Sequence, residues 1–204
     1  MAWVGGSVAI GDKSASDTAA MLQEWTAKWA PRATGRACAL GSDDAVLGQN
    51  LAGRDCVGIE PHVTLLYHGH ATSDALRGVC DKWKLDELQY AGTVKGFHEV
   101  VQRFPDGGGF FGLVLDVACE PLQDGFAAFK AEVAAATGEV PMQSPHTVPP
   151  GETPNKHDYR PHVTLARWAS PEDLAADMAD IRTKCASFWP GLAVAIGPFV
   201  LYEK

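Results

Sequence analysis

One pentapeptide occurs twice in the chain. Pro-His-Val-Thr-Leu stands at residues 61–65 and again at residues 161–165. Each copy lies in the second of three strand-like segments of its half, with a helix-like segment on either side. A chain that repeats both a motif and an order of elements is predicted to fold as two similar, packed units.

The first half has a pattern typical of three strands and two helices. The strands are expected at residues 2–10, 58–67 and 88–101. One helix is expected between a cap at Ser16 and a stop at Pro31, and the other after a cap at Thr72 or Ser73. Residues 32–58 are rich in glycine and polar residues, which favours a loop with room for one short strand.

The second half repeats this order after a turn signal, Pro-Asp-Gly-Gly-Gly at residues 105–109. Its strands are expected at residues 110–118, 159–168 and 192–202. One helix is expected from Pro121 to a glycine stop at Gly138, and another after a cap at Ser170. Five prolines in residues 139–158 exclude a regular element there and predict a mobile flap.

The predicted fold class is therefore α+β. We expect one bilobal domain over residues 1–204, with lobes formed by residues 1–104 and 110–204 and related by an approximate twofold axis. Each lobe is expected to hold an antiparallel-rich sheet and two helices. A groove is expected between the lobes.

Charge limits the kind of partner. Lys and Arg number 17 against 25 Asp and Glu, so the net charge is −8. Such a chain is poorly suited to bind long DNA or RNA through a broad basic face, whereas a small nucleotide or an RNA end held by local donors fits. The chain shows no run of roughly 18 apolar residues, so we expect no membrane span. We also expect a monomer.

The cysteines indicate a compartment. The five are Cys38, Cys56, Cys80, Cys119 and Cys185. No two of them form a Cys-x-x-Cys pair, and the first ten residues lack the basic region of a signal peptide. Reduced thiols in a cytoplasmic protein are therefore expected. A bridge between Cys38 and Cys56 is the alternative.

The repeated motif places polar groups on one face of each strand. In an extended strand, residues i and i+2 share a face, so His62 lies beside Thr64, and His162 beside Thr164. Twofold-related lobes would bring both pairs to one ligand. A neutral imidazole can then take a proton from water, a protonated imidazole can give one to a leaving oxygen, and hydroxyls can bind phosphate oxygens.

A purely structural interpretation is that the repeat serves packing alone. That would explain the valine and leucine of each copy, which face the core. It gives no reason to keep histidine and threonine on the opposite face.

The paired motif resembles the 2H phosphoesterase superfamily, which includes the LigT-type RNA 2′,5′-ligase-like proteins and the 2′,3′-cyclic nucleotide phosphodiesterases. Its hallmark is two His-x-Thr/Ser motifs on a bilobal α+β fold. Residues 159–167, Tyr-Arg-Pro-His-Val-Thr-Leu-Ala-Arg, look like the second motif of the LigT-type members. The closing Val-Leu-Tyr-Glu at residues 200–203 is similar to their final strand.

This resemblance implies that His62 and His162 are the catalytic pair and that Thr64 and Thr164 bind phosphate. It does not decide which histidine is the base and which the acid. The long segments 32–58 and 139–158 depart from a minimal member. Both precede a motif strand, so both are expected to shape a substrate-specific rim.

Three further residues are candidate ligands. Tyr67 and Arg167 each lie five residues after a motif histidine, so a flat strand would point them to the opposite face, whereas a bulge would turn them toward the groove. Their functional roles would be base stacking by Tyr67 and a phosphate clamp by Arg167. Arg160 shares the face of His162 and is an alternative phosphate ligand. Ordinary packing, a solvated charge and a surface salt bridge are the respective alternatives.

No metal or cofactor is expected. Histidines also occur near the motifs, at His68, His70, His146 and His157. Their spacing matches no standard zinc pattern, so exposed loop histidines are the favoured interpretation. His98 is expected to be an ordinary sheet residue, and Trp3 and Trp168 could stack a base but are more typical of core.

The resulting hypothesis is a metal-independent phosphodiesterase that hydrolyses the 2′,3′-cyclic phosphate of a nucleotide or RNA end. One alternative is a hydrolase or ligase of 2′-5′ or cyclic-oligonucleotide linkages. The other is a nucleotide-binding module without turnover.

Overall fold

The computed structural model describes residues 2–36, 61–68, 74–103, 108–141 and 159–203. Within them lie four helices and seven strands. In chain order these are β1 (Ala2–Ile10), α1 (Ala15–Trp29), β2 (Ala33–Arg36), β3 (His62–His68), α3 (Asp74–Lys82), β4 (Tyr90–Arg103), β5 (Gly109–Ala118), α4 (Glu120–Thr137), β6 (His162–Trp168), α5 (Pro171–Cys185) and β7 (Ala193–Glu203). The predicted element order of both halves is therefore confirmed, including the short strand β2.

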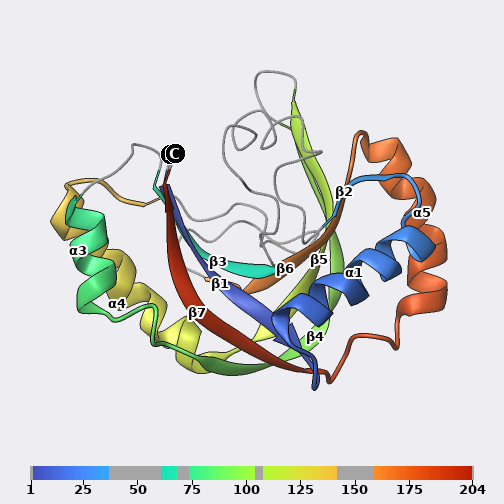
Figure 1. Cartoon of the computed structure of the whole chain (residues 1–204). Helices are drawn as coiled ribbons and strands as arrows, with labels where there is room; N and C mark the ends of the chain where they lie inside the picture. The colour runs from blue at the N-terminus through green and yellow to red at the C-terminus, as the bar shows by residue number, and fades with distance from the viewer. Residues whose placement is uncertain (1, 37–60, 69–73, 104–107, 142–158, 204) are drawn as a thin grey trace.

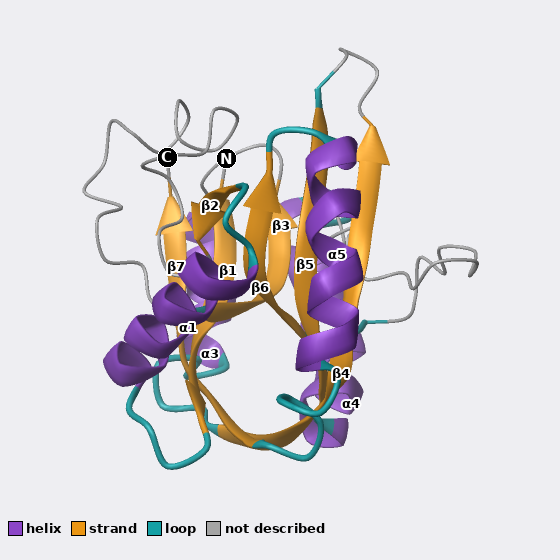
Figure 2. Ribbon diagram, turned by 90° about the vertical axis from the view of Figure 1, so that its right-hand side faces the viewer, coloured by secondary structure: helices purple, strands orange, loops and turns teal. Residues whose placement is uncertain are grey.

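The strands form one antiparallel sheet that closes on itself (Figure 2). Its ring runs β3–β1–β7–β4–β5–β6 and returns to β3, and β2 adds to β6. The closing pair, β3 with β6, is joined by a single residue pair, Val63 with Val163. The mixed α and β class is as predicted, and the sheet is barrel-like.

The two halves of the chain are interlaced. The last strand of each half pairs with the first strand of the other, because β7 pairs with β1 and β4 pairs with β5. Helix α4 packs beside α3, while α1 packs beside α5, with the sheet between the two pairs (Figure 1). The expected division into one lobe from each half is not what the strand pairing shows, and a twofold axis stays a prediction.

Local sequence signals explain the helix ends. Ser170 caps α5 by accepting a hydrogen bond from the Asp173 backbone N–H, and Gly138 ends α4 at a φ of 75° that favours glycine. Helix α1 begins earlier than predicted, because Ser14 and not Ser16 is its cap. The Ser14 oxygen accepts from the Asp17 N–H at 3.1 Å.

The helices bury apolar stripes against the outside of the sheet. Leu122, Phe126, Phe129 and Val133 of α4 are all buried, at the predicted helical spacing. A buried carboxylate, Asp177, ties α5 to the end of β6 by accepting the Trp168 indole N–H at 2.8 Å. Trp168 is therefore buried in the core, which is what its place in a strand predicts.

Several predictions lie outside the described residues. They concern most of the glycine-rich loop, the cap at Thr72 or Ser73, part of the glycine turn, most of the proline-rich segment, and the Cys38–Cys56 bridge. Cys80, Cys119 and Cys185 are buried thiols. In the described part of the chain, no helix is long and apolar enough to cross a membrane.

Candidate active site

The two motif strands meet at the central residue of each motif. Val63 pairs with Val163, and both valines are buried in the core, at 0% and 1% exposed. Because the strands are antiparallel, this register sets His62 next to Thr164 and Thr64 next to His162. All four lie on the face opposite the valines. The register therefore places the two histidines and the two threonines at neighbouring positions on one face of the sheet.

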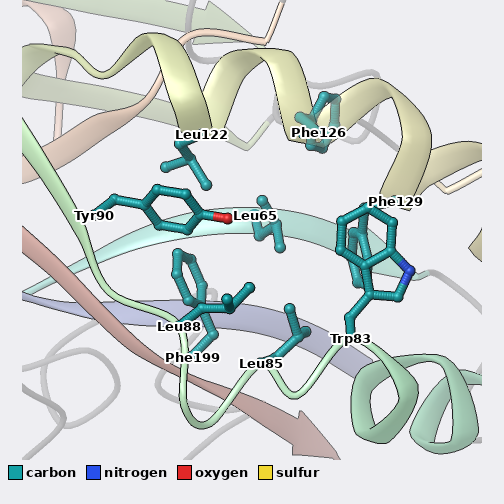
Figure 3. A pocket seen from close by; sticks show the side chains of 10 residues that line it. Leu65, Trp83, Leu85, Leu88, Tyr90, Leu122, Phe126, Phe129 and Phe199 are labelled. Atoms are coloured by element: carbon teal, nitrogen blue, oxygen red, sulfur yellow. The ribbon is translucent and has the colours of Figure 1, made fainter.

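Both motif strands carry a bulge at the same place. In β3, Thr64 and Leu66 pair with consecutive residues of β1, so Leu65 is the extra residue. In β6, Leu165 is the extra residue opposite β5 in the same way. Figure 3 shows Leu65 in an apolar pocket that it lines with Phe126 of α4 and other residues. The repeat thus includes a backbone irregularity whose extra leucine turns toward the core.

The bulge in β3 returns Tyr67 to the face of the motif threonine. The Tyr67 hydroxyl shares a hydrogen bond with the Thr64 side chain, and burial raises the pKa of Tyr67. Its ring centroid lies 6.4 Å from that of Trp3 on β1, and the Trp3 ring lies 4.7 Å from the His62 ring. Trp3, treated as core from sequence, is buried yet touches the candidate catalytic ring.

The bulge in β6 does the same for Arg167. Its register partner is Gly112, which shares a face with Val114, the partner of Thr164. The guanidinium carbon of Arg167 lies 4.4 Å from the centre of the Phe110 ring, a cation–π contact. Burial lowers the pKa of Arg167 to about 10, so the group stays cationic at neutral pH. Phe110 was not singled out from sequence, because it looks like any residue of an apolar strand.

His162 is held in a defined tautomer. It is 6% exposed, and its Nδ1 lies 3.1 Å from the carbonyl oxygen of Arg160. A carbonyl only accepts, so Nδ1 carries the proton and the neutral ring keeps its lone pair on Nε2. Burial lowers the pKa of His162, while the Arg160 carbonyl and Asp116 act in the opposite direction. Arg160 thus contributes its backbone to the site, and a phosphate contact by its guanidinium stays a prediction.

Tyr159 links the approach to the second motif with the first motif strand. Its hydroxyl donates to the backbone oxygen of Thr64 at 2.9 Å, and its ring stacks on Phe126 with centroids 4.1 Å apart. Burial raises the pKa of Tyr159 strongly, so the hydroxyl remains a donor. From sequence, Tyr159 was part of the family resemblance without a role of its own.

Among the described residues, no three His, Cys, Asp or Glu side chains gather in a way that could hold a metal ion. The side chains of His68, His70, His146 and His157 lie outside the described part. The expectation that no metal is needed therefore remains a prediction.

One family model matches the chain. It is described as the 2′-5′ RNA ligase superfamily and matches residues 56–204, which include both motifs and every described strand except β1 and β2. No curated protein matches the chain.

Proposed function

Because the chain belongs to the 2′-5′ RNA ligase superfamily, a group of phosphoesterases and ligases, we propose that it hydrolyses the 2′,3′-cyclic phosphate of a nucleotide or RNA end. The observation that carries this proposal is the pairing of Val63 with Val163. That pairing supports a site with two imidazoles and two hydroxyls on one face, a set of groups that can supply the acid, the base and the oxyanion donors for phosphodiester hydrolysis.

In the proposed reaction, His162 is the base and His62 the acid. Nε2 of His162 takes a proton from a water molecule while the water oxygen forms a bond to phosphorus. The bond from phosphorus to the 2′ or 3′ oxygen breaks, and His62, protonated at the start, gives that oxygen its proton. Thr64 and Thr164 donate hydrogen bonds to the non-bridging oxygens, on which negative charge builds up. Solvent then restores both protonation states.

The assignment of the base rests on the surroundings of His162. Burial lowers its pKa, so the neutral form is favoured near pH 7, and the Arg160 carbonyl fixes the proton on Nδ1. The ring is thereby prepared to accept a proton at Nε2. A base of this kind loses activity as the pH falls and it becomes protonated, so the acidic limb of the rate profile should belong to His162.

The flanking residues are proposed to hold the rest of the substrate. Arg167, on the face of Thr164, would bind a phosphate oxygen or the leaving group. Trp3, buried beside His62, is proposed to hold that imidazole in place. Tyr67 is proposed to orient the Thr64 hydroxyl, since the two side chains share a hydrogen bond. This replaces the base-stacking role expected for Tyr67 from sequence.

The test is a turnover screen with 2′,3′-cyclic nucleotides, 2′-5′ dinucleotides and cyclic dinucleotides, with products identified by ³¹P NMR. We expect a phosphomonoester from the cyclic nucleotides, with activity retained in excess EDTA. Loss of activity in EDTA that Zn²⁺ restores would contradict the metal-independent mechanism. Nucleotide binding by calorimetry without any turnover would identify a binding module instead.

Cleavage or joining of 2′-5′ linkages is the second candidate. It is favoured by the description of the matching family model, which names 2′-5′ RNA ligases. The same acid–base pair would serve it, with a ribose hydroxyl as nucleophile or leaving group. Preferential turnover of 2′-5′ dinucleotides in the same screen would select it.

A further inference from the structure

Three polar side chains lie in a row across neighbouring strands of the sheet. His98 is on β4, Asp116 on β5 and His162 on β6. Asp116 is the register partner of His162, so the two side chains share a face. His98 lies on that face too, because its Nδ1 is 2.8 Å from an oxygen of the Asp116 carboxylate. The sequence predicts that His98 is an ordinary sheet residue. The structure adds its contact with Asp116, next to the candidate site.

The orientation of His98 explains how Asp116 is held. His98 is 11% exposed, and its other nitrogen, Nε2, is buried without a hydrogen-bond partner. A carboxylate oxygen accepts a hydrogen bond, so the tautomer that fits has its proton on Nδ1 of His98. Nδ1 then donates to Asp116. One carboxylate oxygen of Asp116 is fixed by this bond.

Among the described residues, the two motif histidines differ in their register partners. The register partner of His62 is Ser7 on β1, whereas the register partner of His162 is Asp116. The two motif histidines thus have the same neighbours along their own strands but different neighbours across the sheet. A carboxylate as the register partner of His162, and a hydroxyl as that of His62, give the two rings different surroundings.

We propose that Asp116, held in place by His98, is a positioning residue that sets the protonation of His162. This inference rests on the proposed function for its catalytic meaning. Its electrostatic part does not, since the carboxylate acts on the ring whether or not a substrate is turned over. Among the described residues, the titratable or charged groups on the face of His162 or next to it are Asp116 from β5, His98 from β4, His62 from β3, and Arg160 and Arg167 from its own segment.

The direction of the effect follows from the charges. Burial lowers the pKa of His162 and the nearby His98 lowers it further, whereas Asp116 opposes both by favouring the imidazolium. Without the charge of Asp116, His162 would lose its proton at a lower pH. The acidic limb of the rate profile would then move to lower pH.

The experiment is an NMR titration of the His162 ring in the wild type, D116N, D116E and E99Q, with the signal assigned from the H162Q spectrum. We expect D116N to lower the pKa of His162 by roughly 0.5 to 1, and D116E to restore most of it. Glu99 is the matched control. It is a carboxylate on the same strand as His98, but it pairs with Arg182 of α5 on the other face at 2.6 Å, so E99Q should leave the titration unchanged.

A pKa of His162 that is unchanged or higher in D116N overturns the inference, and so does an equal fall in E99Q. Thermal melts of all variants show whether each is folded. The rate profile on a cyclic nucleotide is measured in parallel, and its acidic limb should shift with the NMR value. A shift in the titration with no turnover by the wild type would refute the proposed function and leave the role of Asp116 intact. Turnover by the wild type together with an unshifted titration in D116N would refute the role of Asp116 and leave the proposed function intact.

Discussion

Replacing Tyr159 with phenylalanine removes one oxygen atom that joins the two motif regions. The hydroxyl donates to the Thr64 backbone oxygen at 2.9 Å, and Tyr159 is 7% exposed, so water cannot readily take its place. The ring stack on Phe126 is kept. The loss is therefore that of one buried hydrogen bond with its acceptor left behind, which costs about 1 to 2 kcal/mol. In a chain of this length each kcal/mol lowers Tm by about 2 to 4 °C.

Urea unfolding and calorimetric melts measure this loss, with Tyr90→Phe as the matched control. Tyr90 lies in the same apolar pocket as Phe199 (Figure 3), with their ring centroids 6.0 Å apart. No hydrogen bond between described residues involves its hydroxyl. Tyr90→Phe should therefore change the free energy of unfolding by less than about 0.5 kcal/mol. Equal stability losses in the two variants, or none for Tyr159→Phe, would refute the argument that this hydrogen bond holds the first motif strand to the approach of the second.

Two further predictions concern the site. A Cβ on Gly5 would lie 2.3 Å from an atom of the Trp3 indole, so Gly5→Ala should push that ring away from His62. We expect kcat/KM to fall about tenfold in a turnover assay. Gly78→Ala is the control and should leave kcat/KM unchanged, because a Cβ on Gly78 of α3 meets open space. The lowered pKa of His162 means that the unfolded chain binds more protons as the pH falls through 6.5, so the free energy of unfolding should decrease there. In urea unfolding at pH 8 and pH 5.5, His162→Gln should lose less stability than the wild type; an equal loss would contradict the assigned burial effect.

The order of elements was predictable because each element carries its own signal. Helix caps such as Ser170, the stop at Gly138 and the spacing of apolar residues act over a few positions and can be found in a sequence. The strand pairing that interlaces the two halves, β7 with β1 and β4 with β5, could not be predicted in this way. The pairing of β7 with β1 joins segments at opposite ends of the chain, for which local patterns give no evidence. β4 and β5 are consecutive strands, but the turn signal between them predicts a boundary between two lobes and not a hairpin within one sheet.

The same distinction applies to the site. The His-x-Thr motifs were found because they repeat. The spacing of Tyr67 and Arg167 from the motif histidines predicts that they reach the face of the site only if each strand carries a bulge. The position of the bulge in each strand follows from the register alone. The contact of His98 with Asp116 had no sequence signal, because it depends on the register in which β4 and β5 pair across the turn between them.

The central claim is that His62 and His162 act together on one phosphorus atom. The most direct measurement is kcat/KM for hydrolysis of 2′,3′-cyclic adenosine monophosphate by His62→Ala, His162→Ala and the double variant, with circular dichroism to verify folding. Each single change should lower the rate by roughly 10² to 10⁴-fold. The double variant should lose little more than the worse single one, because both groups serve the same step. Full activity in either folded single variant, or losses that multiply in the double variant, would contradict the account.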